Sequence, residues 1–380
     1  RLAKLTSLEV YKLEEELKRL RELIKKLTAI IASKKLQKDI VKEEMLQIKR
    51  QYKQERKTKF AKAEEDLGSA PEPKEEANQK VVILKSVQNN FKCVSLKQYN
   101  YAQKDVTDNS TLLDTHTLKF ETETNNTIIA FSSLGNCFKV DVKAFTLSRY
   151  RDKGVPEQSI FKELSSNETI VAIFDNNLTN KEGNFIFLTK YGMIKKTAHT
   201  EYSLLKKYYQ GMKLKDDDEI IAVYEEPKNY TYIFVTKQGM VLNAENTDVP
   251  LQGRISGGVK GINLANNDYC VGVGLAGDGG EILAVTNKGF TKRVLVSNVD
   301  KSARYRKGLK FFTFTGDNGR ELIYASVVTN PFTLGCVDNE NNLHYRSTDH
   351  IPIESRTGKG KAVDRMKKSL NIVKAFAVNN

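Results

Sequence analysis

The chain has 380 residues, enough for two or three domains. Its 61 Lys and Arg against 47 Asp and Glu give a formal net charge of +14, which favours an anionic partner such as nucleic acid. Hydrophobic residues make up 39% of the chain and no apolar run reaches 18 residues, which excludes a wholly disordered chain and a membrane-spanning helix. Because the chain begins at Arg1 without a secretory signal pattern, we expect a C-terminal fragment of a longer cytoplasmic protein.

Residues 1–66 predict two helices. Thr6 followed by Glu9 fits a capping box, so the first helix is expected to begin near Ser7. A second, looser apolar row follows over residues 36–52. The first helix carries apolar residues at intervals of 4, 3, 4, 3 and 4, which is a heptad seam: Leu13, Leu17, Leu20, Ile24, Leu27 and Ile31.

This helical segment is predicted to mediate dimerisation. A two-helix unit without a globular core gains most by burying its seam against a second copy. The alternative is that the helices pack on each other or on a domain outside this chain. The segment has 19 Lys and Arg against 12 Asp and Glu, a net charge of +7.

A linker is predicted at residues 67–80, where Gly68, Pro71 and Pro73 prevent a helix from continuing. From residue 81 the sequence changes to short β-branched and aromatic runs separated by Gly, Asn and Asp, which is typical of β-strands. Residues 81–380 are therefore predicted to form an all-β domain.

The β domain contains six repeats, each with a strand followed by a tight turn. The turn residues are separated by 45, 57, 47, 50 and 52 residues, close to the period of propeller blades. A second glycine follows each of the last five turns by 19 residues: Gly154, Gly211, Gly258, Gly308 and Gly360. We predict about four strands per repeat and a six-bladed, propeller-like ring. The six turn residues are Asn90, Gly135, Gly192, Gly239, Gly289 and Asn341.

Basic residues occupy repeated positions in these units. In a radial fold, equivalent positions lie on the same rim or face, so a basic band is expected, with interleaved tyrosines able to pack on sugar while Arg and Lys meet phosphate. One set precedes the second glycine: Arg149, Arg151, Lys153, Lys206, Lys207, Arg254, Lys301, Arg304, Arg306, Lys307, Arg356 and Lys359. Another set follows the first turn and includes Lys195, Lys196, Lys292 and Arg293. We predict that these sixteen residues bind DNA, mostly through its backbone.

No motif in the sequence indicates catalysis or a metal site. There is no phosphate-binding loop, no GxSxG sequence and no pair of neighbouring cysteines. The four cysteines, Cys93, Cys137, Cys270 and Cys336, are far apart and are predicted to be small core residues. We therefore assign no catalytic residue, metal ligand or cofactor to this chain.

Three blade sequences carry a family resemblance. Residues 187–197 (FLTKYGMIKKT), 257–264 (GGVKGINL) and 285–294 (VTNKGFTKRV) resemble the C-terminal β-pinwheel of the A subunits of bacterial type IIA topoisomerases. Residues 1–9 (RLAKLTSLE) resemble the end of the breakage-reunion domain of this family, where the chain forms the exit-gate dimer contact and a coiled-coil arm. The resemblance covers almost the whole chain, with both halves in the family's order.

The resemblance implies a tetramer of two A and two B subunits that cuts one DNA duplex, passes another through the break and reseals it. The family's nucleophilic tyrosine precedes the part that this chain resembles, and ATP and Mg are bound by the B subunit. What the resemblance implies for this chain is DNA capture and bending by the pinwheel, dimer closure through the helices, and a place in the bacterial cytoplasm near the nucleoid.

Within the family, gyrase carries a Gln-led Arg/Gly heptapeptide in its first blade that lets it wrap DNA. The first blade here, residues 86–108, lacks this string, and residues 252–258 (QGRISGG) come closest but lie in the fourth repeat. The sequence thus favours the topoisomerase IV branch of the family over the gyrase branch. Two other interpretations stay open: a propeller scaffold for protein partners on a coiled-coil stalk, and a propeller enzyme with a site in its central channel.

Overall fold

The computed structural model describes residues 2–53, 78–102, 115–215, 217–277, 279–362 and 371–378. The chain divides into two compact units, residues 1–76 and 77–380. The predicted linker lies mostly outside the described residues, and its last residue, Lys80, already begins a strand. None of the described helices is long and apolar enough to cross a membrane.

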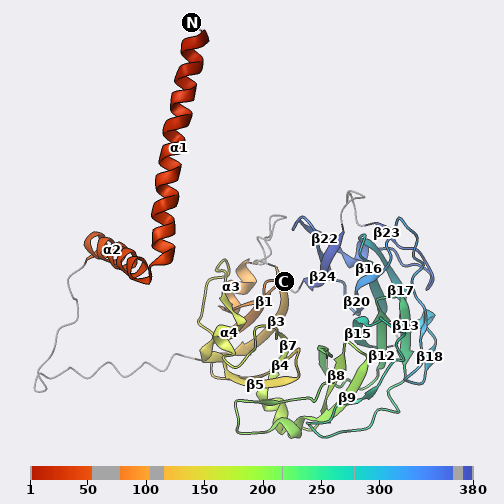
Figure 1. The fold of residues 1–380 in the computed structure, drawn as a ribbon. Helices are drawn as coiled ribbons and strands as arrows, with labels where there is room; N and C mark the ends of the chain where they lie inside the picture. The colour runs from red at the N-terminus through yellow and green to blue at the C-terminus, as the bar shows by residue number, and fades with distance from the viewer. Residues whose placement is uncertain are drawn as a thin grey trace, which may run out of the picture. The chain divides into compact units, whose positions relative to one another are not determined.

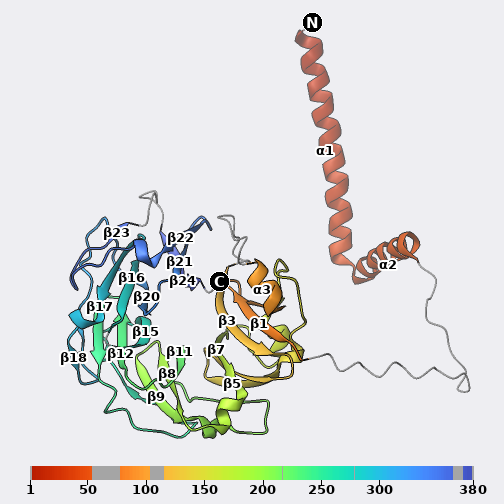
Figure 2. The ribbon, with the colours of Figure 1, turned by 180° about the vertical axis from the view of Figure 1, so that it is seen from behind.

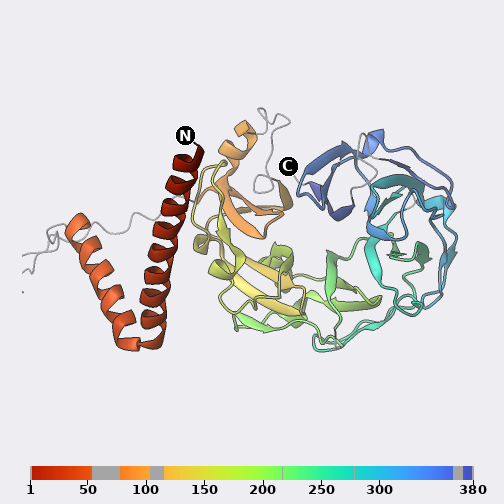
Figure 3. The ribbon, with the colours of Figure 1, turned by 45° about the horizontal axis from the view of Figure 1, so that its top comes forward.

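The described part of the first unit contains two helices, as predicted: α1 (Leu2–Ala32) and α2 (Lys34–Tyr52). Ser33 separates them, and its side chain accepts a hydrogen bond from the backbone N–H of Leu36 as the N-cap of α2. Figure 3 shows the two helices diverging from this junction in a V. The predicted start near Ser7 is wrong, because α1 begins at Leu2 and Thr6 lies inside it.

The predicted seam of α1 is not covered by α2. Its six apolar side chains are between 49% and 77% exposed. A helix with such a stripe gains little stability from its own backbone alone. The seam is therefore an apolar surface without a partner in the described part of this unit.

The described residues of the second unit form a ring of six β-sheets, called blades one to six here, which confirms the predicted six-bladed architecture (Figure 1). Each blade begins with an antiparallel hairpin. The hairpin strands are β1 (Lys80–Ser86) and β2 (Asn90–Ser95); β4 (Thr127–Ser132) and β5 (Asn136–Asp141); β8 (Asn184–Thr189) and β9 (Met193–Ala198); β12 (Thr231–Thr236) and β13 (Met240–Ala244); β16 (Glu281–Thr286) and β17 (Phe290–Leu295); and β21 (Thr333–Asp338) and β22 (Leu343–Ser347).

A third strand in each blade lies nearest the axis of the ring. These inner strands are β3 (His116–Glu123), β7 (Ile170–Asp175), β11 (Ile220–Glu225), β15 (Cys270–Ala276), β20 (Leu322–Val328) and β24 (Ile372–Val378). Each inner strand contacts the next one, and β24 contacts β3, which closes the ring (Figures 1 and 2). Short helices α3 (Leu96–Ala102) and α4 (Glu157–Ile160) follow β2 and β6.

The fourth, outermost strand of a blade is supplied by the following repeat. These outer strands are β6 (Val155–Pro156), β10 (Tyr208–Gln210), β14 (Val259–Lys260), β18 (Lys301–Ser302) with β19 (Leu309–Lys310), and β23 (Lys361–Ala362). They pair with β2, β5, β9, β13 and β17 of the preceding blade. We predicted about four strands from each repeat, but the structure shows neighbouring repeats exchanging strands around the ring.

The turn residue and the second glycine of each repeat both occupy positions that favour glycine. The turn residues adopt the left-handed conformation, with Asn89 rather than the predicted Asn90 in that role in blade one. Four of the five second glycines are left-handed too, and the missing side chain there also permits a close approach of chains. A Cβ on Gly258 would lie 2.4 Å from the carbonyl oxygen of Ile194, and a Cβ on Gly308 would lie 2.5 Å from that of Val241. The second glycine, 19 residues after the turn, therefore marks the point where the chain crosses close to the preceding blade before it adds the outer strand of that blade.

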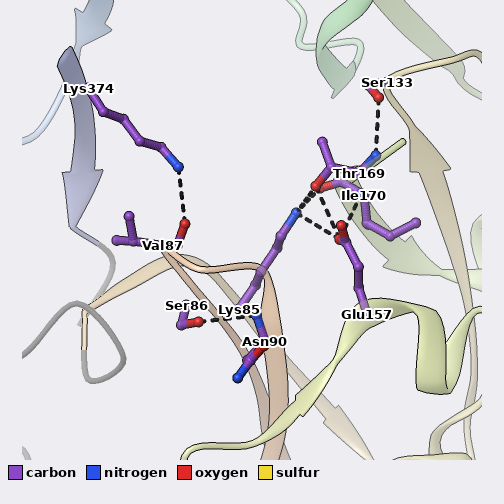
Figure 4. Close-up of polar contacts among 9 residues, drawn as sticks. All are labelled: Lys85, Ser86, Val87, Asn90, Ser133, Glu157, Thr169, Ile170 and Lys374. Carbon is purple, nitrogen blue, oxygen red and sulfur yellow. Dashed lines mark hydrogen bonds and ion pairs between the residues drawn. The ribbon is translucent and has the colours of Figure 1, made fainter. Parts of the chain in front are cut away.

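An apolar cluster fills each interface between neighbouring blades. The cluster between blades one and two includes Ile83 and Phe138, and the one between blades six and one includes Val87 and Phe376. All four cysteines are buried and unpaired, as predicted for core residues. Lys374 of β24 donates a hydrogen bond to the carbonyl oxygen of Val87 at 3.0 Å, across the junction of the last and first blades (Figure 4).

A buried ion pair joins blades one and two. Lys85 Nζ lies 3.1 Å from Glu157 Oε2, and the two side chains are only 6% and 2% exposed. Lys85 also donates to Thr169 Oγ1 and to the carbonyl oxygen of Ile170 (Figure 4). Burial lowers the pKa of Lys85, and Glu157 partly opposes this shift.

Removing one partner should therefore be costly. We expect Glu157→Ala to lower the free energy of unfolding by about 3–5 kcal/mol, because it leaves the Lys85 ammonium buried without its counter-ion. Glu121→Ala is the matched control, since the Glu121–Lys119 pair is half exposed and should contribute less than about 1 kcal/mol. Urea denaturation of both variants measures the difference. Equal effects would show that the hydrogen bonds to Thr169 and Ile170 are enough to stabilise buried Lys85 without Glu157.

Candidate nucleic-acid interface

The first set of predicted basic residues lies at the outer edge of the ring. All of them fall in five segments that end at the second glycine and contain an outer strand or lead into one: residues 147–154, 204–211, 251–258, 301–308 and 353–360. We call these the rim segments. The structure thus brings equivalent positions of five repeats to the same edge, as the radial arrangement predicted.

Nine of the sixteen predicted residues are exposed on the rim segments. Lys207 makes one ion pair there, with Asp141 at 3.4 Å, and both side chains are largely exposed, so solvent screens it strongly. The nine residues are Arg149, Arg151, Lys153, Lys206, Lys207, Lys301, Arg306, Lys307 and Lys359. Exposed cations that repeat along one edge form a surface suited to a polyanion.

Three arginines of the rim segments make hydrogen bonds to the neighbouring blade. Arg254 donates through Nη1 to the carbonyl oxygen of Gln210, at the end of outer strand β10. Arg304 Nη1 donates to the carbonyl oxygen of Lys260 at 3.1 Å, at the end of β14, and Arg356 Nη1 donates to a carbonyl in β19. Each arginine therefore ties its rim segment to the outer strand of the neighbouring blade, a role that the sequence analysis did not foresee.

Lys195 and Lys292 are not part of the surface, which corrects their prediction as DNA-binding residues. Both side chains are 0% exposed. Lys195 Nζ donates to the carbonyl oxygens of Gly211, at 2.9 Å, and of Arg254. Lys292 Nζ donates to that of Arg356 at 2.8 Å. Each lysine lies on the second hairpin strand of its blade. It binds the rim segment that leads into the outer strand of the same blade.

Lys196 and Arg293 follow these buried lysines and are partly exposed. Lys196 Nζ lies 3.3 Å from Glu226 Oε1, and Arg293 Nη1 lies 2.7 Å from Glu281 Oε2. Arg293 also donates through Nε to the carbonyl oxygen of Ile351 at 2.8 Å. Both cations are therefore engaged within the chain, and the second basic set has a mainly structural role.

Three exposed lysines were missed by the sequence analysis. Lys213, Lys260 and Lys310 each lie two residues after a second glycine, at the outer strands or just beyond them. Their common offset from the second glycine was the available signal. They extend the exposed basic surface of the rim segments onto the outer strands.

Burial of Lys195 should make stability depend on pH. Burial, aided by the nearby Arg254 charge, lowers the pKa of Lys195 to about 7. Because the unfolded chain keeps this proton up to about pH 10.5, the unfolded state binds more protons between pH 7 and 10.5. Relative to Lys195→Met, the wild type should therefore gain up to about 1.4 kcal/mol of stability per pH unit over this range.

Urea denaturation at pH 7.5, 8.5 and 9.5 tests this expectation. The control is Lys196→Met, which removes the neighbouring, partly exposed lysine and should alter stability by less than about 1 kcal/mol. A wild-type advantage over Lys195→Met that stays constant with pH would show that Lys195 is protonated in the folded chain throughout.

The fold and the rim together define a class: a strand-exchanged β-propeller with a basic outer edge. A family model described as "DNA gyrase C-terminal domain, beta-propeller" matches residues 126–176, 183–224, 231–276 and 280–320. These four segments fall on blades two to five.

Full-length relatives also match. The A subunit of DNA gyrase from Staphylococcus epidermidis is 30% identical over 373 residues, covering 95% of this chain and 41% of the relative. The A subunit of DNA topoisomerase 4 from Staphylococcus aureus is 26% identical over 360 residues, covering 90% of this chain and 44% of the relative. The chain thus spans less than half the length of these relatives.

Two solved structures share the fold. The crystal structure of the C-terminal domain of DNA topoisomerase IV superposes with a TM-score of 0.70 and 22% identity, covering 80% of this chain and 94% of that one. The DNA gyrase A C-terminal domain superposes with a TM-score of 0.57 and 16% identity, covering 79% and 100%. The chain belongs to the family of gyrase and topoisomerase IV A subunits and corresponds to their C-terminal part.

Proposed function

We propose that the ring binds duplex DNA along its rim and bends it, and that the parent protein belongs to an ATP-dependent type IIA topoisomerase. The observation that carries this proposal is the row of nine exposed cations on the rim segments, extended by Lys213, Lys260 and Lys310. Such contacts neutralise phosphates without reading base sequence. A duplex that follows a curved edge must itself be bent.

The salt dependence of binding tests this proposal. If about five to eight phosphates are contacted, the slope of log K against log salt should be about −4.5 to −7. Fluorescence anisotropy with unrelated duplexes should give similar affinities. A salt-independent affinity, or no binding in low salt, would favour the alternative of a scaffold for protein partners.

The helical unit serves as the dimer contact in this proposal. Its α1 seam is exposed and apolar over six residues, and a second copy supplies a surface of the same kind. A homodimer through these helices places two rings in one assembly, together with two B subunits that bind ATP and Mg. The chain itself supplies no catalytic residue or cofactor ligand in this scheme, and the assembly works on chromosomal DNA in the bacterial cytoplasm.

We further propose a topoisomerase IV-like activity: relaxation and unlinking without negative supercoiling. The QGRISGG sequence is the nearest match to the gyrase heptapeptide, but it lies outside blade one, and Arg254 within it donates to the carbonyl oxygen of Gln210. Incubating the full-length parent protein with its B-type partner, ATP and relaxed plasmid tests this. Negative supercoils that accumulate beyond the relaxed distribution would assign the chain to gyrase instead.

A further inference from the structure

Tyr305 has a backbone conformation that tyrosine rarely adopts. Its φ is +61°, in the left-handed region, where an aromatic residue is a strained outlier. The residue lies three positions before Gly308 in the rim segment of blade four. The equivalent residues of the other rim segments are Arg151, Tyr208, Ile255 and Thr357, and none of these four has a positive φ.

The surrounding backbone holds this conformation in place. The rim segment begins with β18, which pairs with β13, and continues into β19, which pairs with the same strand. The chain is therefore paired to β13 on both sides of Tyr305. Between them, Tyr305 N–H donates to the carbonyl oxygen of Gly261, and Asn263 N–H donates to that of Arg306 at 3.0 Å. Arg304 adds bonds from Nε to the Asp248 carbonyl and from Nη1 to the Lys260 carbonyl, both at 3.1 Å.

The ring of Tyr305 does not stabilise the apolar core. Its side chain is 45% exposed, and it belongs to none of the apolar clusters found among the described residues. Its neighbour is a cation: Lys260 Nζ lies 5.0 Å from the ring centroid. A strained conformation that presents an aromatic ring to solvent has no explanation in packing.

The charges around the Tyr305 side chain indicate what kind of ligand it contacts. Arg306 and Lys307 follow it directly, and Lys260 and Lys310 lie on the outer strands at either side, all four exposed. Arg306 and Lys307 also line a hollow of about 260 Å³ beside the segment, together with Asp300 and Ser302. An apolar ring framed by cations matches a duplex whose phosphates flank its sugars and base edges.

Resting on the proposed DNA binding, we propose that Tyr305 is a bend-determining contact. Its ring enters the minor groove at one base step and partly unstacks the bases of that step, while the surrounding cations hold the two phosphate backbones. Apolar side chains used in this way kink DNA, and the cost depends on how easily the step deforms. Tyr305 would therefore make the six-bladed propeller prefer flexible DNA without recognising its base sequence.

The test compares Tyr305→Gly with wild type in the full chain. Glycine adopts a φ of +61° without strain, so the variant should fold and its midpoint of thermal unfolding should not fall. Two duplexes of equal length carry either flexible TA steps or a stiff A-tract at their centre. Wild type should bind the flexible duplex about tenfold tighter, and end-to-end fluorescence transfer should show a bend. Tyr305→Gly should lose affinity mainly for the flexible duplex, which reduces the preference to about twofold, and it should bend DNA less.

Tyr208→Gly is the matched control, because it removes the tyrosine at the equivalent position of blade two. The ring of Tyr208 lies 5.1 Å from that of Phe138, and its backbone is not left-handed. This variant should lose stability but keep the preference for the flexible duplex. A Tyr305→Gly variant that keeps the preference, or that is markedly less stable than wild type, would overturn the inference. Equal wild-type affinities for the two duplexes would also overturn it and leave DNA binding intact, whereas no binding at all would overturn the proposed function.

Discussion

Charge reversal at Arg306 and Lys307 should weaken duplex binding by about tenfold or more at about 0.1 M salt. These two residues are exposed on the rim segment of blade four, and each substitution to glutamate both removes a phosphate contact and adds a repulsion. The slope of log K against log salt should become less negative by about 1.8, the contribution of two phosphates. Anisotropy titrations at several salt concentrations measure both quantities.

Arg304 is left unchanged in this test, although the sequence analysis placed it in the same cluster. Its side chain fixes the rim segment through two carbonyl oxygens, so a charge reversal there would confuse folding with binding. Lys181→Glu with Lys228→Glu is the control, since it makes the same change in net charge at exposed positions outside the rim segments. Equal losses of affinity in the two double variants would show that overall charge, and not the rim, controls binding.

Replacing Leu17 and Ile24 with glutamate should convert a dimer to a monomer over the micromolar range. The two side chains are 49% and 62% exposed on α1 and lie seven residues apart, on the same face of the helix. In a coiled-coil contact they would face a second copy, so two carboxylates per chain would be buried beside their equivalents. The expected loss of dimer affinity is at least about 100-fold, because unpaired buried charge costs several kcal/mol.

Sedimentation velocity of the full chain measures this effect. Lys18→Ala with Lys25→Ala is the matched control: it makes the same change in net charge one residue further along the helix, off the seam. Thermal unfolding of the ring should be unaffected in both variants, because the helices and the ring are separate compact units. A Leu17→Glu/Ile24→Glu variant that remained dimeric would move the self-association to the ring or to α2.

The shared position of the exposed rim residues could be predicted from the sequence. Repetition alone predicted that Arg149, Lys206 and Lys307 share one edge, because equivalent residues in a radial fold take equivalent places. It could not distinguish Lys195 from Lys196, since both are lysines in one strand and alternation predicts only that they face opposite sides. Lys195 is buried because the rim segment that contains Arg254 covers it, and Arg254 lies 59 residues away in sequence.

Local sequence accounts for the two helices, the six repeats and the turn and glycine positions, because these depend on periodicity and on backbone conformations that few residues adopt. Which repeat completes which blade depends instead on contacts between distant parts of the chain. Outer strands of two or three residues, such as β6 and β10, have too little pattern to specify a partner, and their pairing is fixed by buried lysines, rim arginines and glycine contacts from other repeats. The sequence could not predict the strained backbone of Tyr305 either. The hydrogen bonds that hold it connect residues far apart in the sequence, and they form only in the folded propeller.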